Sequence, residues 1–195
     1  MKKFLLVLML VLPMAIWAQE KHYKTNNDGS VTFERILKAE NKDADVLFSD
    51  VEGYIAQHYT DAKNVIQTKN REQHYIIGQG VFNNVYQWTN KAFGIKTIFS
   101  VPHIVRIDCK DGRIRIQYTI STYEELSGNW MNFERSQSLE TTSIFSQYPI
   151  APSKKENKLD KTEKRYNEAF LNTSAIIEKE FSNIQNCIDT DNQDW

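Results

Sequence analysis

Four basic residues in one short stretch of the sequence could bind an anion. Arg106, Lys110, Arg113 and Arg115 are the only basic cluster that falls on one face of the predicted strands. Guanidinium and ammonium groups bind carboxylate, phosphate or sulfate through charge-assisted hydrogen bonds. The alternative, which we favour from the sequence, is a solvated face that Asp108 and Asp111 neutralise locally.

Aromatic residues flank the connection "QWTNKAFGIK" that joins two predicted strands. Trp88 and Phe93 could dock on a ligand or partner at a hairpin tip, because exposed aromatic residues are enriched at binding sites. Tyr86 and Phe99 lie beside them. Most large aromatic residues are substantially buried, so we favour core positions for this group.

Candidates for acid–base chemistry are few. Glu124 and Glu125 are paired carboxylates at a strand end, but consecutive residues of an extended segment point apart, so solvation is the favoured interpretation. His103 has no acidic or nucleophilic partner in the pattern. Ser127 in "ELSGNW" lacks the strand-to-helix context of a nucleophile. No spacing of His, Cys or acidic residues is typical of a metal site, so we predict no catalytic residue, metal or cofactor.

The stretch "HYIIGQGVF" places two glycines one residue apart, which raises the question of a phosphate-binding loop. Such a loop joins a strand to a helix N-terminus, whereas Gly80 is followed by Val81-Phe82, which continues the strand. Gly78 and Gly80 share one face of that strand. They therefore predict a bend of the sheet or the close approach of a helix or an aromatic ring.

The two cysteines leave two alternatives open. Cys109 is predicted to face inward on its strand, and Cys187 flanks the apolar seam of the last helix. They could form a disulfide in an oxidising compartment or remain two buried thiols.

The N-terminal residues predict the compartment. Lys2 and Lys3 precede a short apolar run, and Ala18 offers a small residue at a cleavage point, so residues 1–18 are typical of a signal peptide. We expect a periplasmic or secreted protein without a stable membrane span. The net charge of the whole chain is −1, and without the two lysines it is −3, which provides no basic excess for nucleic acid.

Periodicity predicts the elements that must position these residues. Residues 31–38 are typical of a strand, and Leu47, Val51, Ile55 and Tyr59 form a helical stripe with Asp43 as N-cap. A period of two over 64–123 predicts four strands. Asp160 and Glu163 form a capping box for a long helix with one apolar seam, composed of Tyr166, Phe170, Thr173, Ile177, Phe181, Ile184 and Ile188.

The dipeptide Asp111-Gly112 predicts a two-residue hairpin turn of type I′ and therefore a register. In this register Lys110 faces Arg113, Cys109 faces Ile114, Asp108 faces Arg115, Ile107 faces Ile116, Arg106 faces Gln117 and Val105 faces Tyr118. Val105, Ile107, Cys109, Ile114, Ile116, Tyr118 and Ile120 then share one side with His103. The arginines share the other side with Asp108.

The element order predicts an α+β fold with a curved antiparallel sheet of about five strands in β-α-β-β-β-β-α order and two helices packed on one face. In chain order we expect a signal peptide at 1–18, a flexible lead-in at 19–30, the α+β domain at 31–123, an irregular aromatic connector at 124–159, and a helix at 160–190 packed on the domain.

Three stretches, "LFSDVEGYIAQHYTDAKNVIQ", "YIIGQG" and "CKDGRIRIQY", resemble an uncharacterised family of secreted bacterial proteins. This family is the domain of unknown function numbered 4468, with a TBP-like fold. The resemblance covers about Val31 to Tyr123 and implies a curved antiparallel sheet backed by two helices. The family has no established catalytic residues to carry over. The DNA-binding protein that gives the fold its name uses the open sheet face, but the signal peptide and the charge argue against that role here.

The well-specified α+β scaffold and the lack of catalytic motifs in the sequence together favour a non-enzymatic module. It would bind an envelope protein, a glycan or a small anionic ligand through the open sheet face or the aromatic loops. One alternative is an envelope hydrolase that uses Glu124, Glu125 or His103. Another is a structural accessory subunit of an envelope complex.

Overall fold

The structure is a computed structural model that describes residues 23–59, 65–129, 138–142 and 159–190. The predicted signal peptide at 1–18 lies outside these residues. The described elements are, in order, β1 (Tyr23–Thr25), β2 (Val31–Lys38), α1 (Ala44–His58), β3 (Ile66–Asn70), β4 (Tyr75–Asn90), β5 (Ile95–Lys110), β6 (Arg113–Ile120), β7 (Tyr123–Asn129), β8 (Ser138–Thr142) and α3 (Lys161–Asp189).

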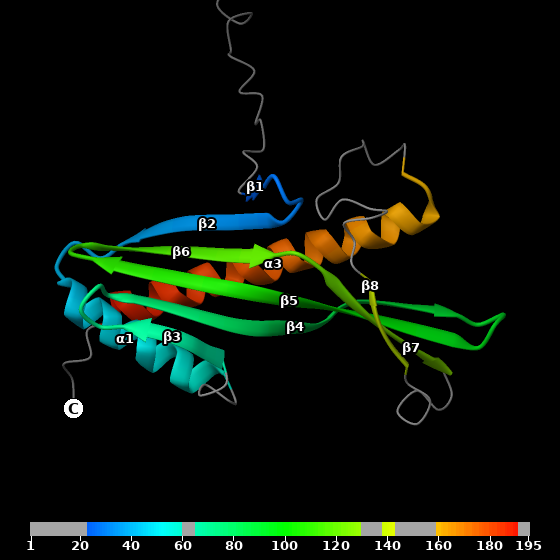
Figure 1. Cartoon of the computed structure of the whole chain (residues 1–195), viewed down its shortest axis with the longest axis horizontal. Coiled ribbons are helices and arrows are strands. Elements are labelled where there is room, and N and C mark those ends of the chain that lie inside the picture. Colours follow the sequence, from blue (N-terminus) through cyan, green and yellow to red (C-terminus); the bar gives the residue numbers. More distant parts are fainter. Residues whose placement is uncertain (1–22, 60–64, 130–137, 143–158, 191–195) are drawn as a thin grey trace, which may run out of the picture.

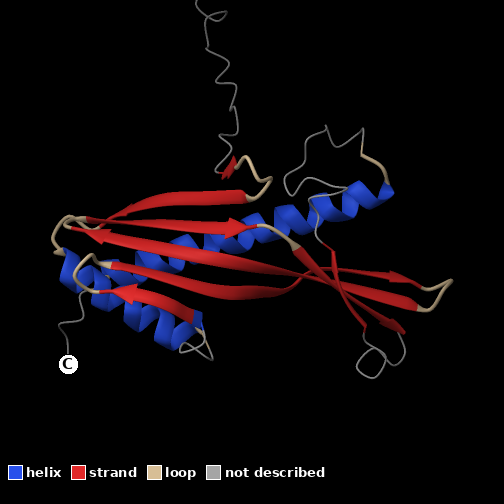
Figure 2. Cartoon of the chain, in the orientation of Figure 1, coloured by secondary structure: helices blue, strands red, loops and turns tan. Residues whose placement is uncertain are grey.

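These elements form an α+β fold in which one antiparallel sheet is backed by two helices on a single face (Figures 1 and 2). The strand order is β1-β2-β6-β5-β4-β3, and β7 pairs with β5 on one side and β8 on the other. The predicted fold class and the helices on one face are confirmed.

The strand count is a correction: the described residues form an eight-stranded sheet rather than one of about five strands. β1 lies in the predicted flexible lead-in, and β7 and β8 lie in the predicted irregular connector. β1 and β7 have little apolar alternation. They join the sheet through backbone hydrogen bonds to the edges of β2 and β5, which do not require an alternating side-chain pattern. A pattern search that relies on apolar periodicity misses such strands.

The hairpin of β5 and β6 has the predicted register at all six pairs from Lys110↔Arg113 to Val105↔Tyr118. The apolar residues predicted for the inner side of this hairpin are buried together with His103, and the arginines face away from the helices, as predicted. The predicted type I′ turn is wrong, because only Gly112 has a positive φ, of 73°. The turn packs against the start of α1, where Asp111 accepts a hydrogen bond from the Ala44 amide (3.0 Å) and Gly112 donates one to the Lys42 carbonyl (2.9 Å).

The core lies between the inner sheet face and the two helices. The α1 stripe buries Leu47, Val51 and Ile55, and all seven residues of the predicted α3 seam are buried. Both predicted N-caps are present, with Asp43 bonded to the Val46 amide and Asp160 in a reciprocal capping box with Glu163. α3 has 29 residues and a length of about 44 Å, so it crosses beneath most of the sheet (Figure 1).

β4 and β5 are 16 residues each and continue past the end of β6 as a twisted arm, with β7 and β8 alongside (Figure 1). The register of β4 against β5 shifts between Phe82 and Tyr86, and Asn84 within this bulge has a φ of 53°. A bulge bends the strand and increases its local twist. The bulge therefore marks the point at which β4 bends between the main part of the sheet and the arm.

Candidate functional site

The structure places Arg106 and Arg115 on the open face of the sheet, where both bind Asp108. Arg106 makes three hydrogen bonds to this carboxylate, the shortest of 2.8 Å, and Arg115 Nη2 lies 2.9 Å from Asp108 Oδ2. The hydrogen bonds from Arg106 and then Arg115 lower the pKa of Asp108. The Arg106 guanidinium also lies over the ring of Tyr75, 5.1 Å from its centroid. The Asp108 carboxylate therefore compensates one of the two arginine charges, so the local neutralisation that the sequence favoured is present only in part.

A second set of cations remains on the same face. Arg113 pairs in register with Lys110 of β5 on one side and with Lys38 of β2 on the other. We call these three residues the basic row. All three are exposed, and none of them forms an ion pair with another residue that the structure describes. Asp111, which was expected to neutralise this end, forms no ion pair with a described residue, and its carboxylate accepts a hydrogen bond from the first amide of α1.

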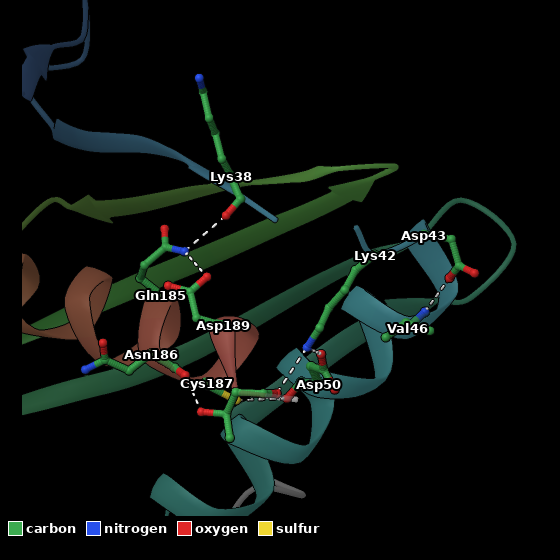
Figure 3. A network of polar contacts seen from close by, with 10 residues as sticks. Lys38, Lys42, Asp43, Val46, Asp50, Gln185, Asn186, Cys187 and Asp189 are labelled. Carbon is green, nitrogen blue, oxygen red and sulfur yellow. Dashed lines mark hydrogen bonds and ion pairs between the residues drawn. The ribbon is translucent and has the colours of Figure 1, made fainter. Parts of the chain in front are cut away.

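Lys38 was missed in the sequence because the pairing of β2 with β6 joins residues about 80 positions apart. The Lys38 carbonyl accepts a hydrogen bond from Gln185 Nε2 of α3 (3.1 Å). Figure 3 shows that the Lys38 side chain points away from α1 and α3. The only signal in the sequence was a lysine at the end of the predicted strand 31–38.

A hollow of about 450 Å³ lies beside the basic row. Its charged lining is composed of Lys110, Arg113, Arg115 and Asp108, and Ile36 and Gln73 complete the exposed part of the wall. Further along the same face, Ile104 and Val81 are each 44% exposed, and Ile36 is 56% exposed. The open face therefore combines a cationic end with aliphatic side chains in contact with solvent.

The predicted aromatic residues lie elsewhere. Trp88 is half-buried beneath Arg165, whose guanidinium carbon is 3.7 Å from the ring centroid, and Phe99 is buried. Phe93 is 77% exposed at the tip of the arm, so the core position that we favoured for it is wrong. Trp88 is eleven residues along β4 from the partner of Arg106, on the order of 30 Å away. The structure therefore does not bring Trp88 and Phe93 together with the arginines.

The residues considered for acid–base chemistry do not form a catalytic group. His103 is buried, its ring stacks on Phe82 at 3.9 Å, and among the described residues its Nε2 has no hydrogen-bond partner. Burial lowers its pKa to about 4. Glu125 accepts a hydrogen bond from the Tyr166 hydroxyl, and Glu124 pairs with Ser100 on the arm. No hydrogen bond within the described chain joins His103 to either carboxylate.

Gly80 pairs with His103 inside a continuous strand, as expected of a shaping glycine rather than a phosphate loop. A Cβ atom at Gly80 would lie 2.8 Å from His103 Nε2 and 3.3 Å from the ring of Tyr59. The predicted close approach of an aromatic ring is confirmed.

Cys109 and Cys187 are both free thiols, so the structure does not contain the disulfide that the sequence left open. Cys109 is buried, which raises its pKa to about 12. The Cys187 thiol instead donates to the Asp50 carbonyl, 3.7 Å away, in the polar network that joins the end of α3 to α1 (Figure 3). In this network Lys42 forms an ion pair with Asp50 (2.9 Å) and donates to the Thr190 carbonyl (3.3 Å).

The described residues contain no group of three or more His, Cys, Asp or Glu side chains that could hold a metal ion. Neither of their helices has a segment that is long and apolar enough to cross a membrane.

Comparisons with known proteins identify the scaffold. The chain resembles a TBP-like protein from Parabacteroides distasonis ATCC 8503, with 16% identity, a TM-score of 0.57 and coverage of 85% of this chain and 96% of the other. It also resembles a DUF4468 family protein from Bacteroides ovatus ATCC 8483, with 14% identity, a TM-score of 0.58 and coverage of 87% and 92%. No curated protein matches the chain. At such low identity these likenesses show the fold alone.

A family model matches part of the sequence, from β2 to the start of β7. It covers the hairpin, the open face and α1, and its bounds agree with the resemblance noted in the sequence. Residues 33–124 match the model of the family described as domain of unknown function (DUF4468) with TBP-like fold.

Proposed function

We propose that this protein is a non-enzymatic binding module of the periplasm or the extracellular space, and that its open sheet face binds a component of the cell envelope. The observation that carries the proposal is the exposure of Ile36, Val81 and Ile104 on that face. These three side chains belong to three different strands of one sheet, β2, β4 and β5.

The contrast between the two sheet faces supports this function. The inner face is sealed by α1 and α3, with Ile107, Ile114 and Ile116 at most 2% exposed. The outer face keeps isoleucine and valine side chains about half-exposed to water, although covering the rest of each would stabilise it by about 1 kcal/mol. A partner that covers them gains this free energy on binding.

The hydrolase alternative lacks support from the geometry, since His103 is enclosed by aromatic rings and Glu125 is held by Tyr166. The accessory-subunit alternative predicts a stable stoichiometric complex, which size-exclusion chromatography of envelope fractions separates from reversible ligand binding.

Carbene footprinting tests the proposal whatever the chemical nature of the occupant. The purified protein is labelled in buffer and in an envelope extract of the cells that make it, and modification is quantified by residue. We expect protection of Ile36, Val81 and Ile104 in the extract. Leu171, which is 55% exposed on α3, is the matched control and should label equally in both conditions. Equal labelling at all four residues would exclude the open face as a binding surface.

A further inference from the structure

The basic row is an unfavourable arrangement for the isolated protein. Lys38, Arg113 and Lys110 occupy directly opposite positions on three adjacent strands, β2, β6 and β5. Directly opposed side chains of a sheet lie about 5 Å apart, and like charges there repel each other. The repulsion is relieved where counter-charges lie close by.

The acids of the same hairpin form no ion pair with the row among the described residues. Asp108 is taken by Arg106 and Arg115, and Asp111 is bonded to the first amide of α1. Glu40 lies next to the turn, where its Cα is 3.7 Å from the position of a Cβ at Gly112, but it forms no ion pair with a described residue. The positive charge therefore stays directed at solvent, although the whole chain has a net charge of −1.

The shape of the site indicates the class of ligand. The row spans two strand spacings, about 10 Å, so one small monoanion contacts only part of it. Arg113 can bind two oxygens of one oxyanion in a fork, and the flanking ammonium groups act as point charges. The adjoining hollow, with Lys110, Arg113 and Ile36 in its wall, offers space for the rest of a ligand.

We propose that the basic row and its hollow bind a small ligand that carries two or more closely spaced phosphate or sulfate groups. This inference rests on the proposed function, because it assigns a ligand chemistry to one end of the open face. Arg113 is the central contact, and Lys38 and Lys110 engage the outer oxyanions.

Calorimetric titration with tripolyphosphate and with sucrose octasulfate tests the inference and distinguishes phosphate from sulfate. Orthophosphate serves as the single-group probe and should bind more weakly than either. The variant Lys38→Gln/Lys110→Gln/Arg113→Gln should lose at least about tenfold in affinity for the tighter oligoanion. The control variant Lys91→Gln/Lys161→Gln/Lys179→Gln removes the same charge from exposed positions outside the row and should change the affinity by less than about twofold.

Thermal unfolding gives an independent readout. Without ligand, the row variant should melt no lower than the wild type, because it relieves repulsion between like charges. The oligoanion should raise the Tm of the wild type and of the control variant, but not that of the row variant.

Three results would overturn the inference: no oligoanion binding by the wild type, equal losses in the two triple variants, or unchanged binding by the row variant. The footprinting experiment separates this failure from that of the proposed function. If Val81 and Ile104 are protected in the extract while tripolyphosphate and sucrose octasulfate do not bind, the open face is a binding surface but the ligand class is wrong. If an oligoanion binds but the extract protects neither residue, the anion site stands and the envelope partner does not.

Discussion

At the scale of single residues, two glycines of this chain have opposite surroundings. Gly80 lies on the inner sheet face, where the His103 ring, held against Phe82, occupies the space that a side chain would need. Gly53 lies in the middle of α1, and a Cβ atom there would meet no atom within 4 Å apart from its chain neighbours and the backbone of its own helix. The first glycine is required by packing, whereas no contact within the described residues requires the second.

Alanine substitutions should therefore change stability in opposite directions. Gly80→Ala should lower the free energy of unfolding by about 1–3 kcal/mol, since His103 must move from its stacked position. Gly53→Ala should raise it by about 0.5–1 kcal/mol, because alanine favours the helix. Urea unfolding followed by circular dichroism measures both changes. A neutral Gly80→Ala variant would show that the ring can move at little cost.

At the scale of elements, one turn joins the hairpin to the helix. Gly112 donates to the Lys42 carbonyl and accepts from the Ala39 amide (2.9 Å each), and the Asp111 carboxylate accepts from the Ala44 amide. An acidic group at a helix N-terminus satisfies a free amide and interacts favourably with the helix dipole. The turn therefore fixes where α1 begins relative to β5 and β6.

Removal of this carboxylate should loosen that junction. Asp111→Ala should lower the free energy of unfolding by about 1 kcal/mol, because the Ala44 amide loses its acceptor. Asp111→Asn retains an acceptor oxygen and should cost less than half as much. Hydrogen exchange of the first turn of α1, compared with its last turn, localises the effect. Equal exchange in the wild type and in Asp111→Ala would contradict this role for the turn.

At the scale of the whole molecule, a buried neutral histidine couples folding to pH. His103 is 4% exposed, and its pKa is lowered from 6.5 to about 4 by burial. Burial raises the pKa values of its neighbours Tyr59 and Tyr118 above 10, so both tyrosines stay neutral over the pH range in which His103 titrates. Asp108 affects stability at lower pH than His103. Its pKa is lowered on folding, so the stability that it contributes is present above pH 3.8 and is lost as the pH falls below that value.

The sign of the His103 effect follows from linkage. The unfolded chain binds the proton more tightly than the folded one, so the free energy of unfolding is highest above about pH 6.5 and falls toward pH 4. The loss should reach the order of 3 kcal/mol. Urea unfolding at about pH 7 and about pH 4.5 should show it in the wild type and in the control His58→Gln, whose histidine is exposed. The difference between the two pH values should shrink in His103→Gln. An undiminished difference in that variant would assign the pH dependence to other groups.

The hairpin register, the helical stripes and both N-caps could be predicted from the sequence, because each depends on neighbours within a few residues. A two-residue turn fixes the pairing of Lys110 with Arg113, and the alternation of isoleucine with arginine then determines which face is buried. By the same local rule, Gly80 could be assigned to a continuous strand rather than to a phosphate loop.

Only the tertiary structure decided which charges remain free and which strands complete the sheet. The alignment of Lys38 with Arg113 comes from the pairing of β2 with β6, and the use of Asp111 as a cap comes from the docking of α1 on the turn. β1 and β7 are held mainly by backbone hydrogen bonds to long neighbours, which leave little trace in side-chain pattern. Contacts of this kind join segments far apart in the chain, so local periodicity has no information about them.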